Sequence, residues 1–307
     1  MNIQADIQVG ALFKLIVHKG DPLKPSKQLP FFHNLVLDAG LDRLSVGSAI
    51  GVVCVGSGNS TPVATQTSLD SFIASTTQIN GSDERGNQTS TPPFHVWARR
   101  TYRFGEGVAA GNLSEIGIGW TVSNLFNRAL IKDASGNPVT ITVLSDEYLD
   151  VIVELRMYPQ QTISSVLNLR DKSNNIVSTH TVTGSCLISE TGSFSIGKVE
   201  LKRYTQGLRI HSGSKNEPIN ALPSNSIGDI SMSNSYPTPR KCVGVAVVAL
   251  NAAVGTHRSF YTAIQNLVTL NAYTIGYKWE IDPPIEKTNQ QEITYTCSLT
   301  WGRYEPT

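Results

Sequence analysis

The chain has 307 residues, about two domains of ordinary size, and it carries 25 Lys and Arg residues against 24 Asp and Glu. A net charge of +1 argues against binding to nucleic acid or anionic lipid, because both need an excess of basic residues. Only 16% of the residues are charged, whereas Ser and Thr number 58, so we expect a polar surface with few charges. Such compositions are common in extracellular and virion structural proteins.

The sequence predicts no membrane insertion and no signal peptide. Its longest apolar run, 242–255, has fourteen residues and falls short of the ~20 that a membrane helix needs. The first residues have neither the basic start nor the apolar stretch of a secretory signal.

Alternation of apolar and polar residues is the dominant pattern, and it predicts β-strands along the whole chain. Two long strands, 149–157 and 293–301, each have one buried and one solvated face. Residues 135–138 and 171–175 have the composition of hairpin turns, and the prolines of 282–284 are expected to end a strand. The other predicted strands are 12–18, 50–55, 94–104, 114–120, 128–132, 139–144, 165–169, 176–183, 198–204, 243–250 and 273–281.

Helix is expected to be scarce. The spacing of leucines predicts a short helix over 34–44, with Asn34 as its N-cap. Apolar residues within 69–73 predict one further helical turn, and 258–267 fits either a helix or a strand.

Two long polar loops are predicted, at 78–93 and 207–239. A loop of that length in a compact domain is usually functional or is ordered by a partner. We therefore expect both to act as arms that contact neighbouring proteins.

These elements predict an all-β fold with two antiparallel β-sandwich-like domains, residues 1–159 and 160–307, and very little helix. Each half contains Ile-Gly-x-x-Trp, at 116–120 and 275–279, followed by a proline, a carboxylate and a long alternating strand. A diverged duplication and convergence of β-sequences explain these marks equally well, and both interpretations stay open.

The four cysteines lie far apart, form no CxxC pair and lack the spacing of a zinc site. We expect free buried thiols, with a disulfide as the less favoured alternative. They are Cys54, Cys186, Cys242 and Cys297.

Two glycine-rich segments match phosphate-binding loops only in part. Residues 192–198 fit the first seven positions of a P-loop, but Val199 follows where Ser or Thr would bind Mg²⁺, and the next residues alternate like a strand. Residues 105–111 lack the GxGxxG spacing, and no phosphate ligand follows them. We reject the first segment as a P-loop and interpret the second as a tight loop.

The histidines form no HxH or HxxxH pair, so a metal site would need residues that the fold brings together. His95 with Glu106 across a hairpin is one such candidate, but exposed or strand-face histidines are the favoured interpretation. The six are His18, His33, His95, His180, His211 and His257.

Three carboxylates, Asp146, Glu147 and Asp150, crowd the start of one long strand. A carboxylate pair held about 5–10 Å apart can cleave glycosides. We expect instead a solvated turn, with Asp150 on the polar face of its strand. No GxSxG nucleophile elbow is present, and we expect no catalytic, cofactor-binding or metal-binding residues and no enzyme activity.

Arg99 and Arg103 share one face of the predicted strand 94–104, and Arg100 lies on the other, with aromatic residues on both faces. We favour contact with another subunit over a nucleic-acid or sugar site. Core packing is favoured over a carbohydrate platform for the tryptophans, which are Trp97, Trp120, Trp279 and Trp301.

A series of short motifs runs through the first half of the chain. Asn-Leu-Val-Leu-Asp-Ala-Gly-Leu-Asp at 34–42 leads to Val-Cys-Val-Gly-Ser-Gly-Asn-Ser-Thr-Pro at 53–62, then Thr-Ser-Leu at 67–69, Arg-Phe at 103–104 and Leu-Ser-Glu-Ile-Gly at 113–117. Over about residues 30–155 this order resembles the N-terminal region of tailed-bacteriophage tail proteins. The resemblance implies a tail fibre, baseplate or other minor virion component and carries over no catalytic residue.

We therefore expect a structural subunit of a phage tail, at the baseplate or as a fibre base or adaptor, assembled in the host bacterial cytoplasm. Its expected partners are copies of itself in a symmetric oligomer and other tail, baseplate or fibre proteins. One alternative is a receptor-binding module that contacts a host surface glycan or pilus through its loops, where Tyr236 is the clearest aromatic residue. A cell-wall hydrolase and a neck or head decoration protein are less favoured.

Overall fold

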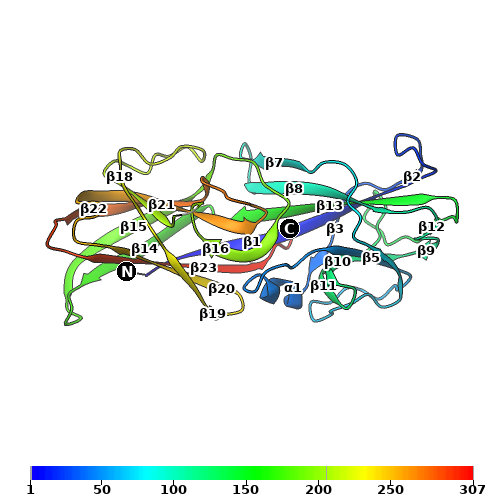
Figure 1. Ribbon diagram of the computed structural model, residues 1–307, viewed down its shortest axis with the longest axis horizontal. Coiled ribbons are helices and arrows are strands. Elements are labelled where there is room, and N and C mark those ends of the chain that lie inside the picture. The colour runs from blue at the N-terminus through cyan, green and yellow to red at the C-terminus, as the bar shows by residue number, and fades with distance from the viewer. Residues whose placement is uncertain (1, 205, 307) are drawn as a thin grey trace.

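The computed structural model describes residues 2–204 and 206–306 as an elongated body built almost entirely of strands (Figure 1). The all-β prediction with very little helix is confirmed, since the described residues contain one α-helix, α1 (Asp38–Arg43). In the first half of the chain the strands are β1 (Asn2–His18), β2 (Pro25–Gln28), β3 (Phe32–His33), β4 (Leu35–Val36), β5 (Val52–Gly56), β6 (Phe72–Thr76), β7 (Glu84–Gln88), β8 (His95–Phe104), β9 (Gly111–Leu113), β10 (Glu115–Thr121), β11 (Asn124–Leu130), β12 (Ile141–Val143) and β13 (Tyr148–Pro159). In the second half they are β14 (Thr162–Arg170), β15 (Ile176–Ile188), β16 (Ile196–Leu201), β17 (Leu208–His211), β18 (Ser226–Ile230), β19 (Ser233–Thr238), β20 (Lys241–Val248), β21 (Gly255–Leu267), β22 (Ile275–Lys287) and β23 (Ile293–Arg303).

One large sheet passes through both halves of the body, in the order β19-β20-β23-β1-β13-β8-β7, with β2 and β3 also paired to β1. A sheet of order β4-β11-β10-β5-β6 lies at one end of the body, and a sheet of order β14-β15-β22-β21-β17-β18 lies at the other, with β16 paired to β21 (Figure 1). Strands β9 and β12 form a separate pair. The sheets enclose a main apolar core, which includes residues from both ends of the chain.

Strand β1 joins the two halves of the large sheet. Its residues Asn2–Val9 pair in parallel with β23, and its residues Ile7–His18 pair antiparallel with β13. All odd-numbered side chains from Ile3 to Val17 are buried. The period-2 alternation continues along the strand because its pairing with β13 and β23 contains no bulge. The boundary expected at 159–160 falls between β13 and β14, and the first residues of β1 pair across it.

Of the three segments with helical spacing, 34–44 contains the predicted short helix but begins it later, 69–73 is not helical, and 258–267 takes the strand alternative. Asn34 is not an N-cap, because Leu35 and Val36 pair with β11 as β4 and the helix begins only after Leu37, which makes no side-chain capping bond. The turn predicted within 69–73 is instead the start of β6, which pairs with β5. The ambiguous segment 258–267 is part of β21, a strand paired on both sides.

Both predicted long loops contain strands. The segment 78–93 includes β7, which pairs with β8, and 207–239 includes β17, β18 and β19. The prolines of 282–284 do not end their strand, and β22 continues to Lys287. They lie where the register with β21 shifts, between His257 and Ser259, so no ladder donor is needed from them.

The irregular part of the second segment, 212–225, is fastened to the sheet by a buried lysine of β22. The Lys278 ammonium is fully buried and donates hydrogen bonds to the carbonyl oxygens of Pro218 at 2.6 Å and Ala221 at 2.9 Å. The Ser259 hydroxyl donates to the Gly213 oxygen at 2.6 Å. These bonds hold the segment to the protein's own sheet without a partner molecule.

We expect the wild-type protein to gain stability relative to a Lys278→Met variant as the pH rises from 7 to 9.5. Burial lowers the pKa of Lys278 from its ordinary value of 10.5 to about 8. The unfolded chain therefore binds this proton more tightly between pH 8 and 10.5, and the free energy of unfolding rises with pH through that window, by about 2 kcal/mol at pH 9.5. Urea unfolding of both proteins at both pH values measures the difference. Lys24→Met, at an exposed lysine, is the control, and parallel pH profiles for wild type and Lys278→Met would contradict the assignment.

Candidate functional site

Two opposite charges are buried together on the β5-β10-β11 sheet. Glu115 of β10 and Arg128 of β11 have fully buried side chains, and the Arg128 Nε lies 2.9 Å from the Glu115 Oε2. Their strands are adjacent and antiparallel, with Gly117 opposite Arg128, so the two side chains are diagonal neighbours on one face. Burial of a carboxylate and a guanidinium carries a large desolvation cost, which is offset here because each group is fully hydrogen-bonded.

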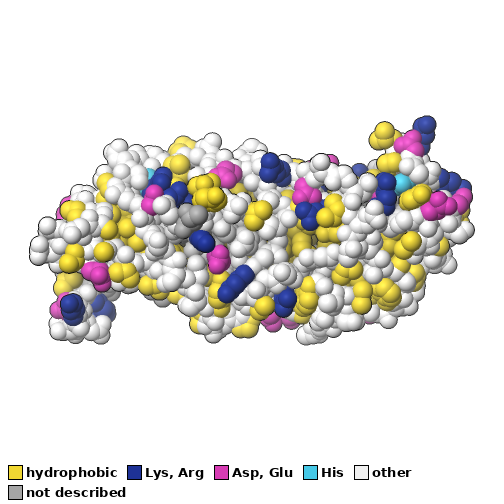
Figure 2. Space-filling view, in the orientation of Figure 1, with side chains coloured by type: hydrophobic (Ala, Val, Ile, Leu, Met, Phe, Trp, Pro, Cys, Tyr) yellow, Lys and Arg dark blue, Asp and Glu magenta, His cyan; other side chains and the backbone are white. Residues whose placement is uncertain are grey.

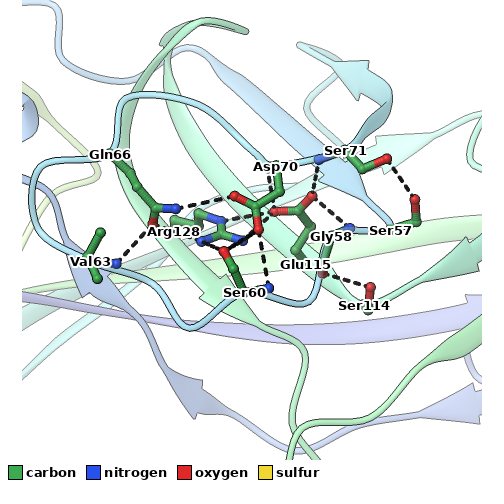
Figure 3. A network of polar contacts seen from close by, with 10 residues as sticks. All are labelled: Ser57, Gly58, Ser60, Val63, Gln66, Asp70, Ser71, Ser114, Glu115 and Arg128. Carbon is green, nitrogen blue, oxygen red and sulfur yellow. Dashed lines mark hydrogen bonds and ion pairs between the residues drawn. The ribbon is translucent and has the colours of Figure 1, made fainter.

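The Glu115 carboxylate holds the segment between β5 and β6, which we call the 57–71 loop. Its Oε1 accepts hydrogen bonds from the backbone N–H groups of Gly58 at 2.9 Å and Ser71 at 2.7 Å, and its Oε2 accepts from the N–H of Asp70 at 3.0 Å (Figure 3). The Ser114 hydroxyl donates to the Gly58 oxygen at 2.9 Å. One carboxylate therefore ties together both ends of the loop.

Arg128 holds the middle of the same loop. Its Nη2 lies 2.7 Å from the Asp70 Oδ2, and its Nη1 donates to the Gln66 side-chain oxygen at 2.8 Å (Figure 3). Asp70 also accepts hydrogen bonds from the Ser60 hydroxyl and N–H. The bonds from Ser60 and the charge of Arg128 lower the pKa of the Asp70 carboxyl, so Asp70 stays ionised at neutral pH.

A small apolar cluster separate from the main core lies on this face of the sheet. It consists of Leu37, Val52, Cys54, Leu69 and Leu125. Leu69 comes from the 57–71 loop and Leu37 from the segment before α1, so the loop is fixed by apolar contacts as well as by charge.

Two glycines of the sequence motifs stand where no side chain fits. A Cβ on Gly58 would lie 2.4 Å from the Glu115 Oε1 and 2.5 Å from the Asp70 Cβ, and a Cβ on Gly40 would lie 2.4 Å from the Phe126 oxygen. Gly58 and Ser60 come from one motif and Glu115 from another that lies more than fifty positions away, and the fold gathers them in one network. The arrangement can hold a surface loop rigid.

We expect Gly58→Ala to destabilise the protein by about 2 kcal/mol, because the added methyl group must displace Glu115 or Asp70. Gly51→Ala is the matched control, since a Cβ there meets nothing within 4 Å and Gly51 is exposed. Thermal or urea unfolding of the two variants tests this. Equal stability of the two would show that the loop adjusts freely.

Each of the three candidate carboxylates has a partner within the chain. Asp146 is exposed and pairs with Lys19 at 2.6 Å, as a solvated turn would. Glu147 and Asp150 are buried, contrary to the prediction, because Ser26 of β2 donates to Glu147 at 2.5 Å and Arg103 bonds both oxygens of Asp150 at 2.7 Å.

The three arginines of β8 lie on the faces that the sequence predicted, and each is paired within the chain. Arg99 pairs with Glu154 and Glu84, and Arg103 pairs with Asp150. On the other face Arg100 bonds Asp83, and its guanidinium lies 4.4 Å from the Phe194 ring centroid. Basic and acidic side chains are interspersed on the face shown in Figure 2.

The His95 and Glu106 pair is not formed, because β8 separates the two residues by its full length of ten residues, about 30 Å. His95 bonds the Pro93 oxygen at 2.9 Å, and Glu106 accepts from the Tyr148 hydroxyl at 3.3 Å. All six histidines lie in strands, but only His33 is exposed; the other five are buried. In the described part of the chain no three His, Cys, Asp or Glu side chains are grouped to hold a metal ion.

The four cysteines are free and buried, as predicted, and burial raises the pKa of Cys54 and Cys297 to about 12. Trp279 and Trp301 are in the core, whereas Trp97 and Trp120 are half-buried beneath arginines. Residues 105–111 form a turn, and β16 begins within 192–198, where a P-loop would need a helix.

Tyr236, expected to be the clearest exposed aromatic residue, is half-buried. Its hydroxyl donates to the Val199 oxygen at 2.7 Å, and the Lys198 ammonium lies over its ring.

Sequence reasoning named Glu115 within a motif but missed Arg128 and Asp70 as its partners. The available signal was one charged residue in each of two strands that carry no other charge, which is typical of a buried pair.

No helix in the described ranges is long and apolar enough to cross a membrane. Comparison of the chain with protein-family models, with curated proteins and with solved structures finds no match.

Proposed function

We propose that this protein is a structural subunit of a bacteriophage tail, at the baseplate or as a fibre base or adaptor, and that it acts through contacts with copies of itself and with other virion proteins. The observation that carries the proposal is the network around Glu115 and Arg128. It joins two of the motifs on which the resemblance to tail proteins rests, through Gly58 and Glu115, and it fixes the 57–71 loop from both ends and the middle.

A loop held in this way presents a fixed surface to a neighbour. Val63 of the loop and Phe72 at the start of β6 are about half exposed, at 52% and 51%. Rigid apolar side chains at a surface lose little conformational entropy on association, which favours assembly. In this proposal the chain carries out no reaction, and its place is the tail of the particle after assembly in the host cytoplasm.

Quantitative mass spectrometry of purified particles from the source phage, with antibody labelling under the electron microscope, tests the proposal. We expect several copies per particle, with the label at the end of the tail. Labelling at the neck or head would replace the tail role with a connector or decoration role, and absence of the chain from particles would overturn the proposal.

A further inference from the structure

A cleft of about 340 Å³ opens on the side of the body next to β7. Arg85 of β7 lines it from the first half of the chain, and Glu190, Ser193, Leu270 and Asn271 line it from the second. Its volume lies at the small end of the range of about 300–1,000 Å³ for small-molecule sites, so it suits a ligand of one or two rings.

An exposed aromatic pair borders this cleft. The rings of Tyr204 and Tyr273 are stacked with centroids 5.0 Å apart, and each residue is 42% exposed. Tyr273 follows Ala272, which lines the cleft and accepts a hydrogen bond from the Tyr204 N–H at 3.3 Å. Glu190 accepts from the Tyr273 N–H at 3.2 Å. The pair is therefore anchored at the rim.

The polar groups of the cleft are free to bind a ligand. Arg85 and Asn271 are exposed, and their side chains make no hydrogen bond or ion pair with any described residue. Glu190 uses its Oε1 for Tyr273 and Thr274, which leaves its Oε2 available. The cleft thus offers donors and acceptors side by side, and the charges of Arg85 and Glu190 cancel.

The backbone around the cleft is strained. Tyr204, Val268 and Asn271 have φ values of 51°, 54° and 53°, in the left-handed region that non-glycine residues rarely adopt. Such strain persists where the surrounding structure enforces it, and it clusters at binding sites. Here it sets the positions of one tyrosine and one asparagine at the rim.

We propose that this cleft binds an uncharged saccharide, with one sugar ring packed on the exposed Tyr204–Tyr273 pair and its hydroxyls bonded to Arg85, Asn271 and Glu190. Hydroxyl groups both donate and accept, which matches the mixed polar lining, and the C–H face of a pyranose is apolar enough to lie on an aromatic ring. Single-stranded nucleic acid also stacks on aromatic rings but needs a basic groove, and Arg85 faces an acidic residue here. The site does not depend on the assembly role proposed above.

Saturation-transfer NMR on the full chain tests this with five probes: D-glucose, D-galactose, D-mannose, L-rhamnose and N-acetyl-D-glucosamine. We expect transfer to the ring C–H protons of at least one sugar. Tyr273→Ser and Asn271→Ala should each weaken its binding by about tenfold or more, whereas Tyr273→Phe should retain it. Phe72→Ala, which removes an equally exposed ring on β6, is the matched control and should bind like the wild type.

Three outcomes would overturn the inference. They are the absence of transfer from the wild type to every probe, unchanged binding in both Tyr273→Ser and Asn271→Ala, and loss of binding in Phe72→Ala to the same extent. Thermal unfolding of each variant shows whether it is folded, and if Tyr273→Ser unfolds, unchanged binding in Asn271→Ala alone overturns the inference. The result is independent of whether the chain is found in particles.

Discussion

Glu115→Ala is expected to lower the free energy of unfolding by about 5 kcal/mol. The substitution leaves the fully buried Arg128 guanidinium without its fully buried counter-charge and removes the acceptor of the N–H groups of Gly58, Asp70 and Ser71. Breaking a buried ion pair costs about 3–5 kcal/mol, and each buried donor left without a partner adds to that cost. Urea unfolding followed by circular dichroism measures the loss.

Substitution of Arg128 removes the charge opposite Glu115 but leaves the backbone hydrogen bonds of Glu115 in place, so it measures the contribution of the charge alone. Arg128→Met should cost less, about 3 kcal/mol, because Glu115 keeps its three backbone donors. The combined variant should be more stable than the sum of the two losses implies, since it leaves no unpaired buried charge. Lys24→Ala, which breaks an exposed pair with Asp21, is the control and should change stability by less than about 0.5 kcal/mol. A loss below about 1 kcal/mol for Glu115→Ala would contradict the role of the network.

Ile3→Asp and Leu15→Asp should each lower the free energy of unfolding by about 4 kcal/mol or more. The two variants are expected to begin unfolding in different halves of the chain. Both side chains are 1% exposed in the core, where an unpaired carboxylate is strongly disfavoured. Ile3 lies opposite Cys297 of β23, and Leu15 lies opposite Val151 of β13. Ile3→Asp is therefore expected to open the second half of the chain first, and Leu15→Asp the first half.

Limited proteolysis with mass spectrometry distinguishes these outcomes. The earliest cuts in Ile3→Asp should fall within residues 160–306, and those in Leu15→Asp within residues 19–158. Gln4→Asp places the same charge on the exposed face of β1 and should leave the cleavage pattern of the wild type unchanged. If both core variants are cut first at the same sites, the two parts of β1 do not stabilise the two halves of the chain separately.

Local alternation was enough to predict most strands, but the start of β1 was missed. Its apolar residues Ile3, Ala5, Ile7 and Val9 alternate with polar residues as regularly as in any predicted strand. Small side chains such as Ala5 reduce the difference in hydrophobicity between the two faces of the strand, and the predicted strand began only at residue 12. The opposite error occurred at 69–73, where helical spacing was present but pairing with β5 decided the structure.

The candidate site was predictable only in part, because its contacts join residues that are far apart in the sequence. Arg128 meets Asp70 across 58 positions, and nothing local to either residue identifies the other. The same holds for Tyr204 and Tyr273, whose stacking depends on how the two segments lie against β21 and β22. Tyr236 appeared more exposed from its sequence because its hydroxyl partner, the Val199 oxygen, is also remote.

The parallel pairing of β1 with β23 has a mechanical consequence. If tension acts on the chain through Asn2 at one end of the pair and Arg303 at the other, it pulls the two strands past each other along their length. The ladder hydrogen bonds between residues 2–9 and 296–303 are then loaded together, and the force cannot open them one at a time. A protein built this way would resist stretching along its long axis far more than peeling at β7 or β19, the two outer strands of the same sheet.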